Sequence, residues 1–410
     1  MAKGKRSRSA RERGDFYDYS LLAVVIILIC FGLVMLYSAS AYEAATSSAI
    51  KDDMFYFRRQ AEFDVAAIVL AVFLSNLRNA DYHFAIRIAP AVYVISFVLM
   101  AMVKYSPLGR SAGGARRWLY LGVQFQPSEI AKIAVILSTS YLILRIGKNM
   151  GTVKAFFVLI FFGAVQAVGA FYLTDNLSTG IIIMGICFFM VFLASPNTRR
   201  YLVLFAAIGV TIAVSLFAIN RIFSSSSNFR MRRILVWLHP EKYLASGGYQ
   251  VMQGLYAIGS GGLFGKGLGN STQKLSTIPE AQNDMIFSII CEELGLFGAI
   301  IVLLLFAYLL YRLFFIAQNA PDLYGTLIAS GVFVHIALQV ILNICVVLNL
   351  IPTTGVTLPF VSYGGTSVIF LMIEIGMALN VARQIRFEDE PGKEGAGNEY
   401  PISERNSERG

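Results

Sequence analysis

Long apolar runs alternate with short polar segments along most of this 410-residue chain. About ten of these runs are predicted to be membrane-spanning helices, because roughly 20 helical residues cross a hydrocarbon core of about 30 Å. The predicted spans are residues 17–41, 61–76, 84–104, 128–146, 153–173, 177–195, 200–220, 284–316, 323–350 and 360–384. The pattern predicts an all-α polytopic membrane protein with one domain over residues 17–386. A large loop, residues 221–283, separates helices 7 and 8.

The composition supports this class. Hydrophobic residues make up 56% of the chain and charged residues only 14%. The two ends differ, since residues 1–16 and 387–410 are charged and poor in apolar side chains, which predicts disordered tails. The four cysteines lie singly in apolar runs, without the spacing of a metal site, and are expected to be buried thiols.

Lysine and arginine near the helix ends predict how the chain is oriented. The N-terminal tail is basic, and many of the basic residues next to the spans fall on the same side as that tail. By the positive-inside rule this side is the cytoplasm, which places both termini there and the loop 221–283 outside. Two outer segments, residues 104–129 and 221–283, carry basic residues against the rule, among them Arg117, Arg230 and Arg233. Either a span is misassigned, or these residues bind an anionic partner such as phosphate or anionic lipid.

The motif QPSEIAKIAVIL opens the fourth span. Pro127 and Ser128 suit a helix start, and Glu129 follows in the first turn. Glu129 and Lys132 are three positions apart, so they share a helix face and can form an ion pair. One interpretation is a capping acid beside a lysine that extends to the membrane surface. The other is a functional pair, because Lys132 lies inside the span and ionisable groups there usually face a cavity.

Acidic residues surround the start of the eighth span, in TIPEAQNDMIFSIICEELG. Asp284 opens this span shortly after Glu280, and it is either a helix cap or a proton acceptor at the mouth of an apolar helix. Its position beside the basic outer segments, at the depth of Glu129, favours the proton acceptor. Glu292 and Glu293 lie about two turns deeper and are either partners within the bundle or polar packing residues.

Two segments rich in glycine or proline interrupt the apolar pattern. GSGGLFGKGLGNS lacks the GxxxxGK[ST] spacing of a phosphate loop, so a turn-rich outer loop is the favoured interpretation. LNLIPTTGVTLPFVSYGGTS breaks an apolar run with prolines and glycines, which is tolerated at membrane depth where the backbone lines a cavity or is buried in protein. It is predicted to be either a cavity wall, with polar side chains such as Ser362 and Tyr363, or a purely structural turn.

Four stretches together resemble the SEDS family of bacterial membrane proteins (shape, elongation, division and sporulation). They are GARRWLYLGVQFQPSEIAK, FRMRRILVWLHP, GGYQVMQGLYAIGSGGLFGKGLGNSTQKLSTIPEAQNDMIFSIICEELG and TTGVTLPFVSYGGTSVIFLMIEIGMALNVAR. They occur in family order, and the resemblance covers nearly everything except the two tails. PEAQND and GGTS…ALN look more like the division members than the elongation members, and a sporulation paralogue stays open. Thr357 and Asn283 depart from the proline and threonine that the family commonly has there.

The resemblance implies a peptidoglycan glycosyltransferase of the bacterial plasma membrane. It would polymerise lipid II on the outer face, together with a class B penicillin-binding protein and other divisome membrane proteins. The family's catalytic aspartate matches Asp284. The substrate-binding residues expected in the same cavity are Arg117, Glu129, Lys132, Arg230, Arg233, Lys274, Glu280, Ser362 and Tyr363. No cofactor is required and no nucleic acid is expected, while a divalent cation at the pyrophosphate stays open without a ligand cluster to support it.

The implied mechanism makes Asp284 the general base. It takes the proton from the 4-hydroxyl of the acceptor's N-acetylglucosamine, whose oxygen attacks the anomeric carbon of the donor chain. Undecaprenyl pyrophosphate leaves with inversion at that carbon, while arginines and lysines neutralise its charge and Glu129 orients Lys132. One alternative is a transporter that flips a lipid-linked precursor, which needs a cavity open to both faces. The other is a scaffold that recruits the class B penicillin-binding protein and would tolerate Asp284→Asn.

Overall fold

The computed structural model describes residues 17–46, 50–76, 82–112, 115–196, 199, 203, 229–275, 278 and 281–386. The helices are α1 (Tyr19–Thr46), α2 (Phe55–Asn76), α3 (Phe84–Tyr105), α4 (Pro127–Ile146), α5 (Val153–Leu173), α6 (Leu177–Ala194), α8 (Phe229–Leu238), α9 (Gly248–Gly261), α10 (Ile286–Asn319), α11 (Leu323–Val347) and α12 (Ser367–Ala382). The strands are β1 (Gly109–Ala112), β2 (Ala115–Leu121) and β3 (Val123–Phe125), and the short 3-10 helices are η1 (Gly147–Gly151), η2 (Pro240–Lys242) and η3 (Leu244–Ser246). The predicted tails 1–16 and 387–410 lie outside the described residues, as does the predicted span 200–220 apart from residue 203.

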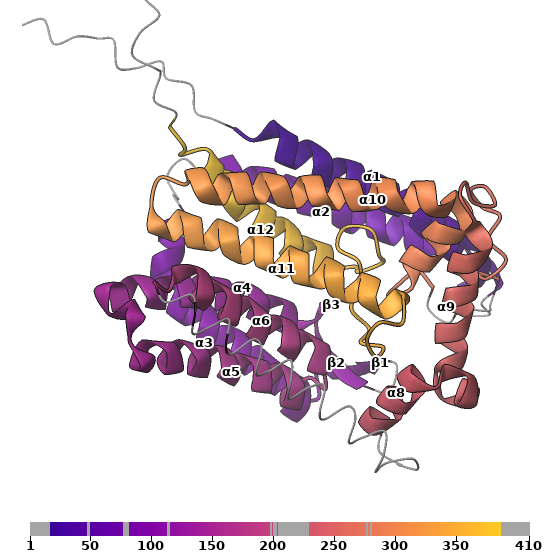
Figure 1. The fold of residues 1–410 in the computed structure, drawn as a ribbon, viewed down its shortest axis with the longest axis horizontal. Coiled ribbons are helices and arrows are strands. Elements are labelled where there is room, and N and C mark those ends of the chain that lie inside the picture. The colour runs from indigo at the N-terminus through magenta and orange to yellow at the C-terminus, as the bar shows by residue number, and fades with distance from the viewer. Residues whose placement is uncertain are drawn as a thin grey trace, which may run out of the picture.

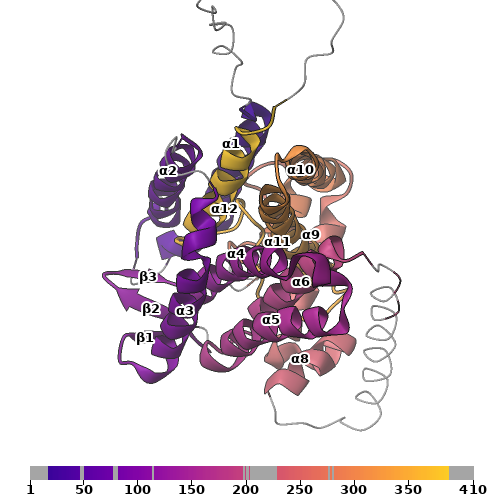
Figure 2. The same ribbon diagram turned by 90° about the vertical axis from the view of Figure 1, so that its left-hand side faces the viewer.

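The long helices form a bundle of two groups joined by α11. In one group α1 packs against α2 and α10, and α2 packs against α12. In the other group α4 packs against α3, α5 and α6. Helix α11 contacts both groups, through α10 and α12 on one side and α4 and α6 on the other, and it lies near the centre of the bundle (Figures 1 and 2). A continuous apolar core runs through both groups.

Seven helices among the described residues are long and apolar enough to cross a membrane: α1, α3, α4 with η1, α5, α6, α10 and α11. This confirms the predicted class of polytopic helical membrane protein. Helix α2 begins at Phe55 and not near residue 61. The apolar pattern did not predict its first turns because they carry charged residues such as Arg58 and Arg59. Helix α12 begins at Ser367 and not at residue 360, because the preceding proline- and glycine-containing segment forms turns.

Several helices start where local chemistry favours a start. Helix α4 has Pro127 at its first position, where the missing amide hydrogen costs nothing. Asn176 caps α6, since its side-chain oxygen accepts a hydrogen bond from the Thr179 amide at 3.1 Å. Asp322 caps α11 in the same way, accepting from the Gly325 amide at 2.7 Å. These caps supply partners for amides that the helices themselves leave unpaired.

The predicted span 284–316 is not one continuous helix. Gly295 has φ 68° and ψ −167°, so α10 consists of a short helix, residues 286–294, followed by a longer one. A side chain at position 295 would place its Cβ atom 2.3 Å from the Gly265 nitrogen and 2.6 Å from the Leu263 oxygen. The break therefore requires glycine both for its positive φ and for the close approach of the loop before α10.

One end of the bundle carries irregular structure that the all-α prediction did not include. Strands β1, β2 and β3 form an antiparallel sheet between α3 and α4, with a turn at Gly122, where φ is 85°. Helices α8 and α9 lie at this end too, whereas the start of α1 and the end of α12 lie toward the opposite end (Figure 1). The bundle is therefore asymmetric, with both described chain ends on one side and the loop elements on the other.

Candidate functional site

A cavity of about 610 Å³ lies at the end of the bundle that carries the sheet, α8 and α9. We refer to it as the polar cavity. Its wall combines α2, β2, α4, α6, α8, α9 and α11 with the segments just before α10 and α12. The residues that line it are Arg59, Phe63, Arg117, Trp118, Gln124, Gln126, Glu129, Lys132, Asn176, Ser178, Thr179, Ile182, Arg233, Gln250, Asn283, Asp284, Gln339, Gly355, Val356, Thr357, Tyr363, Gly364, Gly365, Thr366 and Ser367. Most of these side chains are polar, whereas an extended apolar core fills much of the bundle.

Glu129 and Lys132 form a buried ion pair within the first two turns of α4. The Lys132 Nζ atom lies 2.9 Å from Glu129 Oε2, and the two side chains are 3% and 11% exposed. Lys132 also donates to Gln339 Oε1 of α11 at 3.4 Å, and the Gln339 amide donates to the Thr357 carbonyl at 3.1 Å. The lysine is thus held by two helices and does not extend to the membrane surface.

Asp284 lies in the cavity wall, two residues before the first residue of α10. Met285 occupies the N-cap position, so Asp284 is not the helix cap. The Asn343 side chain of α11 donates to the Asp284 carbonyl at 2.9 Å and to the Val356 carbonyl at 2.7 Å. Gln250 of α9 approaches the carboxylate itself, with 3.5 Å between its Nε2 atom and Asp284 Oδ1. The backbone of Asp284 is therefore anchored while its carboxylate faces the cavity.

Three guanidinium groups reach the polar cavity from different elements. Arg233 of α8 donates to the Thr353 carbonyl at 3.4 Å. Burial lowers the pKa of Arg233, and the negative charge of Asp284 opposes that effect. Arg117 of β2 donates to the Asp175 carbonyl at 3.4 Å, and Arg59 of α2 lines the cavity as well.

The segment before α12 forms turns and also part of the wall of the polar cavity. The Ser362 hydroxyl is buried and accepts a hydrogen bond from the Leu358 amide at 2.8 Å, so this residue stabilises the turn. Tyr363 lines the cavity, and its ring packs edge-on against Tyr56 with 5.1 Å between centroids. The Gln60 side chain of α2 accepts from the Gly364 and Gly365 amides at 3.2 and 3.0 Å. Ser362 thus fits the interpretation as a structural turn, and Tyr363 fits the interpretation as a cavity wall.

The cavity brings together six of the residues singled out from the sequence: Arg117, Glu129, Lys132, Arg233, Asp284 and Tyr363. Lys274 lies apart from it, in an ion pair with Glu293 at 2.7 Å. Lys274 is therefore not among the residues that line the polar cavity. Glu280 and the side chain of Arg230 lie outside the described residues.

Some residues of the site were not singled out from the sequence. Gln339 and Asn343 contact Lys132 and Asp284, and together with His335 they make a polar stripe at every fourth position of α11. His335 lies deepest and pairs with Glu374 of α12 at 2.7 Å. The spacing of these polar residues inside an apolar run was the available signal. Arg59 was missed because the second span was predicted to begin after it.

The arrangement defines what the cavity can do chemically. A half-exposed carboxylate can accept a proton from a bound hydroxyl. Buried or half-buried cations can neutralise negative charge on a bound group, and their interactions are stronger where water is excluded. Among the residues that the structure describes, no group of three or more histidine, cysteine, aspartate or glutamate side chains is placed to hold a metal ion.

Comparison with known proteins agrees with this picture. A family model described as cell cycle protein, which covers FtsW, RodA and SpoVE, matches residues 18–387. The chain is 37% identical to stage V sporulation protein E of Bacillus subtilis (strain 168), over 90% of this chain and 98% of that one. It is 32% identical to the probable peptidoglycan glycosyltransferase FtsW of Geobacter sp. (strain M18), over 91% of this chain and 99% of that one.

Solved structures show the same fold. A chain from a peptidoglycan synthase complex that coordinates polymerization and crosslinking superposes with a TM-score of 0.72 and 26% identity, over 90% of this chain and 98% of that one. The rod shape determining protein RodA of Thermus thermophilus superposes with a TM-score of 0.62 and 27% identity, over 91% and 98%.

The fold and the site define a class of protein: a helical membrane bundle with a charged cavity at one end. Within that class the chain belongs to the family of FtsW, RodA and SpoVE, the SEDS proteins. Its relatives include several named as probable peptidoglycan glycosyltransferases, which supports a glycosyltransferase as its general function.

Proposed function

We propose that this protein polymerises lipid II into glycan strands, with Asp284 as the general base. The observation that carries the proposal is the convergence of Asp284 with Arg117, Lys132 and Arg233 on one cavity of about 610 Å³. Glycan transfer from a lipid pyrophosphate needs one base for the acceptor hydroxyl and cations for the leaving group. A carboxylate and several cations in one polar cavity supply both.

In the proposed reaction the Asp284 carboxylate takes the proton of the 4-hydroxyl of the acceptor's N-acetylglucosamine. The freed oxygen forms a bond to the anomeric carbon of the donor's N-acetylmuramic acid, and the bond from that carbon to the pyrophosphate oxygen breaks. Undecaprenyl pyrophosphate leaves as an anion, stabilised by Arg117, Arg233 and Lys132. A single base with direct displacement inverts the anomeric configuration, by analogy with inverting glycosidases.

Glu129 has an orienting role in this proposal. Its carboxylate and Gln339 hold the Lys132 ammonium group from two sides, at 2.9 and 3.4 Å. A lysine side chain held in this way loses little freedom when the pyrophosphate binds, which favours binding. Glu129 is itself neutralised by Lys132 and is therefore a weaker candidate for the base than Asp284.

The cellular setting follows from the reaction. We place the polar cavity at the outer face of the plasma membrane, where the sugars of lipid II are exposed to water while the polyprenyl chains stay in the bilayer. Both termini are then cytoplasmic, since the start of α1 and the end of α12 lie toward the opposite end (Figure 1). We propose a class B penicillin-binding protein as partner, because one structural relative belongs to a complex that couples polymerization to crosslinking. Division and sporulation are both compatible with the relatives, which include FtsW and stage V sporulation protein E.

The packing beneath the cavity supports an enzyme more than a transporter. Ile136, one turn deeper than Lys132 on α4, is fully buried, as are Ile186 and Met190 of α6. Ile136 and Met190 pack directly over Gly331 of α11, where an added Cβ would lie 2.6 and 3.1 Å from their atoms. Close packing of apolar side chains at this level supports a reaction site that is open to one face only.

The test is glycan polymerisation by the purified full-length protein, given lipid II with and without its cognate class B penicillin-binding protein. Polymer of many disaccharide units, separated on a gel, is the expected product. A parallel assay follows fluorescent lipid II across proteoliposome membranes. Translocation without polymer, even with the partner present, would contradict the proposal and support the transporter. If neither assay gives a signal, the scaffold would be supported.

A further inference from the structure

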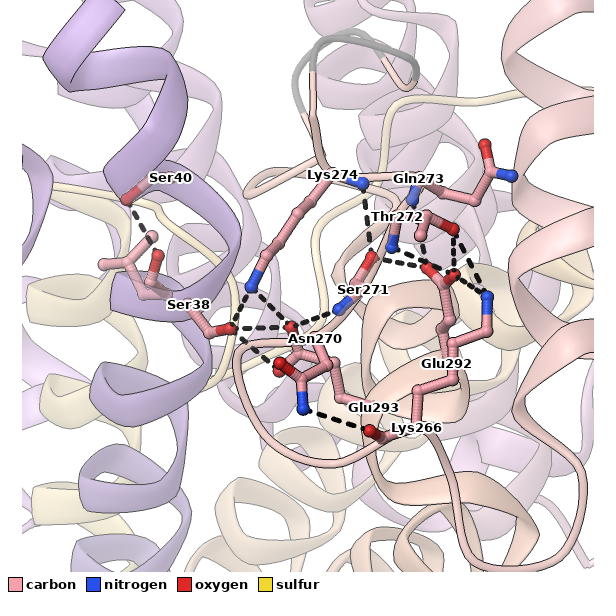
Figure 3. A network of polar contacts seen from close by, with 11 residues as sticks. Ser38, Ser40, Lys266, Asn270, Ser271, Thr272, Gln273, Lys274, Glu292 and Glu293 are labelled. Carbon is pink, nitrogen blue, oxygen red and sulfur yellow. Dashed lines mark hydrogen bonds and ion pairs between the residues drawn. The ribbon is translucent and has the colours of Figure 1, made fainter.

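A second cluster of charged side chains lies outside the polar cavity, where the loop after α9 meets the break in α10. Glu292 and Glu293 of α10 are both completely buried. Each pairs with a lysine of the loop: Lys266 Nζ lies 2.6 Å from Glu292 Oε1, and Lys274 Nζ lies 2.7 Å from Glu293 Oε1 (Figure 3). A buried charge is costly unless it is paired and hydrogen-bonded, so these two carboxylates need the loop in this position.

Glu292 also organises the backbone of the loop. Residues 272–275 form a bend and a turn, and polar groups of residues 271–273 converge on its carboxylate (Figure 3). It accepts hydrogen bonds from the Ser271 hydroxyl, from the Thr272 amide and hydroxyl at 3.2 and 2.9 Å, and from the Gln273 amide at 3.3 Å. One carboxylate thus provides partners that a helix or strand would otherwise supply.

Glu293 connects the loop to α1. The Ser38 hydroxyl of α1 donates to the Glu293 carboxylate at 2.7 and 2.8 Å from its two oxygens. Lys274 Nζ lies 2.9 Å from the same hydroxyl and donates to it. Three elements therefore meet at this buried pair: α1, the loop and α10.

Backbone hydrogen bonds join the loop to both sides of the break at Gly295. They are Lys266 N to Glu292 O at 2.9 Å, Gly267 N to Glu293 O at 2.9 Å, Leu296 N to Gly262 O at 2.9 Å and Phe297 N to Leu263 O at 3.0 Å. They satisfy peptide groups that the interrupted helix leaves without partners. We call the whole assembly, residues 262–274 with Glu292, Glu293 and Ser38, the loop latch.

The loop latch sits at the far end of the short helix that follows Asp284. Residues 286–294 span about 13 Å at 1.5 Å per residue, with Asp284 before the first turn and the two glutamates in the last. Helix α9, which leads into the latch, carries Gln250, and this side chain approaches the Asp284 carboxylate. The latch is therefore connected to Asp284 in two ways, through the short helix 286–294 and through α9.

We infer that Glu292 and Glu293 are positioning residues, which hold the short helix 286–294 and its aspartate in place by binding the loop after α9. The inference rests on the proposed function for its effect on catalysis, but the latch itself can be tested without any substrate. It also assigns Lys266 and Lys274 to the latch, and not to the pyrophosphate. A displacement of about 1 Å at a reacting group can lower turnover roughly 100-fold, which sets the size of the expected effect.

The first experiment measures hydrogen exchange of the purified full-length protein in detergent. Glu292→Gln, Glu293→Gln, Lys274→Met and the double variant Lys274→Met/Glu293→Gln are compared with wild type. The matched control is Glu241→Gln, which changes an acid of the same connecting region whose side chain is 57% exposed. Faster exchange in peptides covering residues 262–275 is expected for the latch variants, with unchanged exchange in α11 and in the control. Wild-type exchange in all the latch variants would overturn the inference.

The second experiment measures initial rates of polymerisation against lipid II concentration. The latch variants are expected to lose about 10- to 100-fold in kcat with KM within about twofold, because they misplace the base without touching the substrate. The double variant removes both buried charges, so it leaves no unpaired ion and is expected to fold like wild type. Its kcat loss is expected to be no larger than that of Glu293→Gln, since the two residues act as one unit.

The outcomes separate the inference from the proposed function. A raised KM with unchanged kcat, or additive losses from Lys274→Met and Glu293→Gln, would mean that these side chains contact substrate directly and would overturn the inference. Loss of kcat with wild-type exchange in residues 262–275 would overturn it too. If wild type makes no polymer, the proposed function fails, and the exchange experiment still decides whether the latch exists.

Discussion

Replacing Glu129 by glutamine is expected to destabilise the bundle more than replacing Glu129 and Lys132 together. Glu129→Gln removes the negative charge beside Lys132, so the buried ammonium group is left with neutral acceptors only, among them Gln339 Oε1 at 3.4 Å. Glu129→Gln/Lys132→Met removes both charges and leaves nothing buried and unpaired. The comparison therefore separates the stabilising role of the pair from its proposed role in binding pyrophosphate.

The size of the effect follows from the geometry. At the 2.9 Å separation of Nζ and Oε2, the Coulomb energy is about 6 kcal/mol for an effective dielectric constant of about 20. Most of that gain offsets the cost of taking two charges out of water. Removing one partner of such a pair typically costs about 3–5 kcal/mol, whereas replacing both is close to neutral. We expect Glu129→Gln to lose about 3 kcal/mol of unfolding free energy and the double variant to stay within about 1 kcal/mol of wild type.

The assay is denaturant unfolding in detergent micelles, followed by circular dichroism. Asp52→Asn serves as control, because it breaks the exposed ion pair with Arg58 and is expected to cost about 0–1 kcal/mol. Equal loss of stability in the Glu129 single variant and the double variant would refute the reasoning, since it would mean that no unpaired charge is buried. The double variant should make no polymer although it is stable. Wild-type polymerisation by it would refute the role of Lys132.

Further substitutions test how the site is held. Asn343→Leu removes the two hydrogen bonds that the carbonyls of Asp284 and Val356 accept from Asn343, at roughly 0.5–1.5 kcal/mol for each bond, so thermal unfolding should occur at a lower temperature and turnover should fall. An unchanged melting temperature would contradict the contacts described. Gly295→Ala is expected to give little folded protein on size exclusion, because its Cβ atom would lie 2.3 Å from a backbone nitrogen at a φ of 68°. Arg233→Met should raise KM for lipid II at least tenfold, judged from initial rates, and weaken the salt dependence of KM, because one charge–charge contact is lost. An unchanged KM would remove Arg233 from the site.

The hydrophobic pattern predicted the helices well wherever a span is purely apolar. The expected span 153–173 coincides with α5, Val153–Leu173. It failed where a helix carries charge into the bundle, as in α2, whose first turns include Arg58 and Arg59. It also could not show the break at Gly295, because one glycine in an apolar run is equally compatible with a continuous helix.

Local spacing was informative for the site, and tertiary contacts were not predictable. Glu129 and Lys132 share a helix face at three positions' separation, and the structure shows the ion pair that this spacing allows. Lys274 was expected at the substrate from the family resemblance, whereas in the structure the loop folds back and pairs this lysine with Glu293, a contact that nothing in the sequence indicates. Pairings of this kind depend on the path of a loop, which no periodicity encodes.

The most direct test of the account is polymerisation of lipid II by the Asp284→Asn variant beside wild type and the Glu241→Gln control. The substitution changes one oxygen to nitrogen and keeps the backbone hydrogen bond from Asn343, so the variant should fold normally. If Asp284 is the base, wild type and the control make polymer, and the rate from Asp284→Asn is lower by at least about 100-fold. General base catalysis contributes a factor of roughly 10²–10⁴ to the rate. Equal rates from Asp284→Asn and wild type would contradict the central claim that this carboxylate is the base.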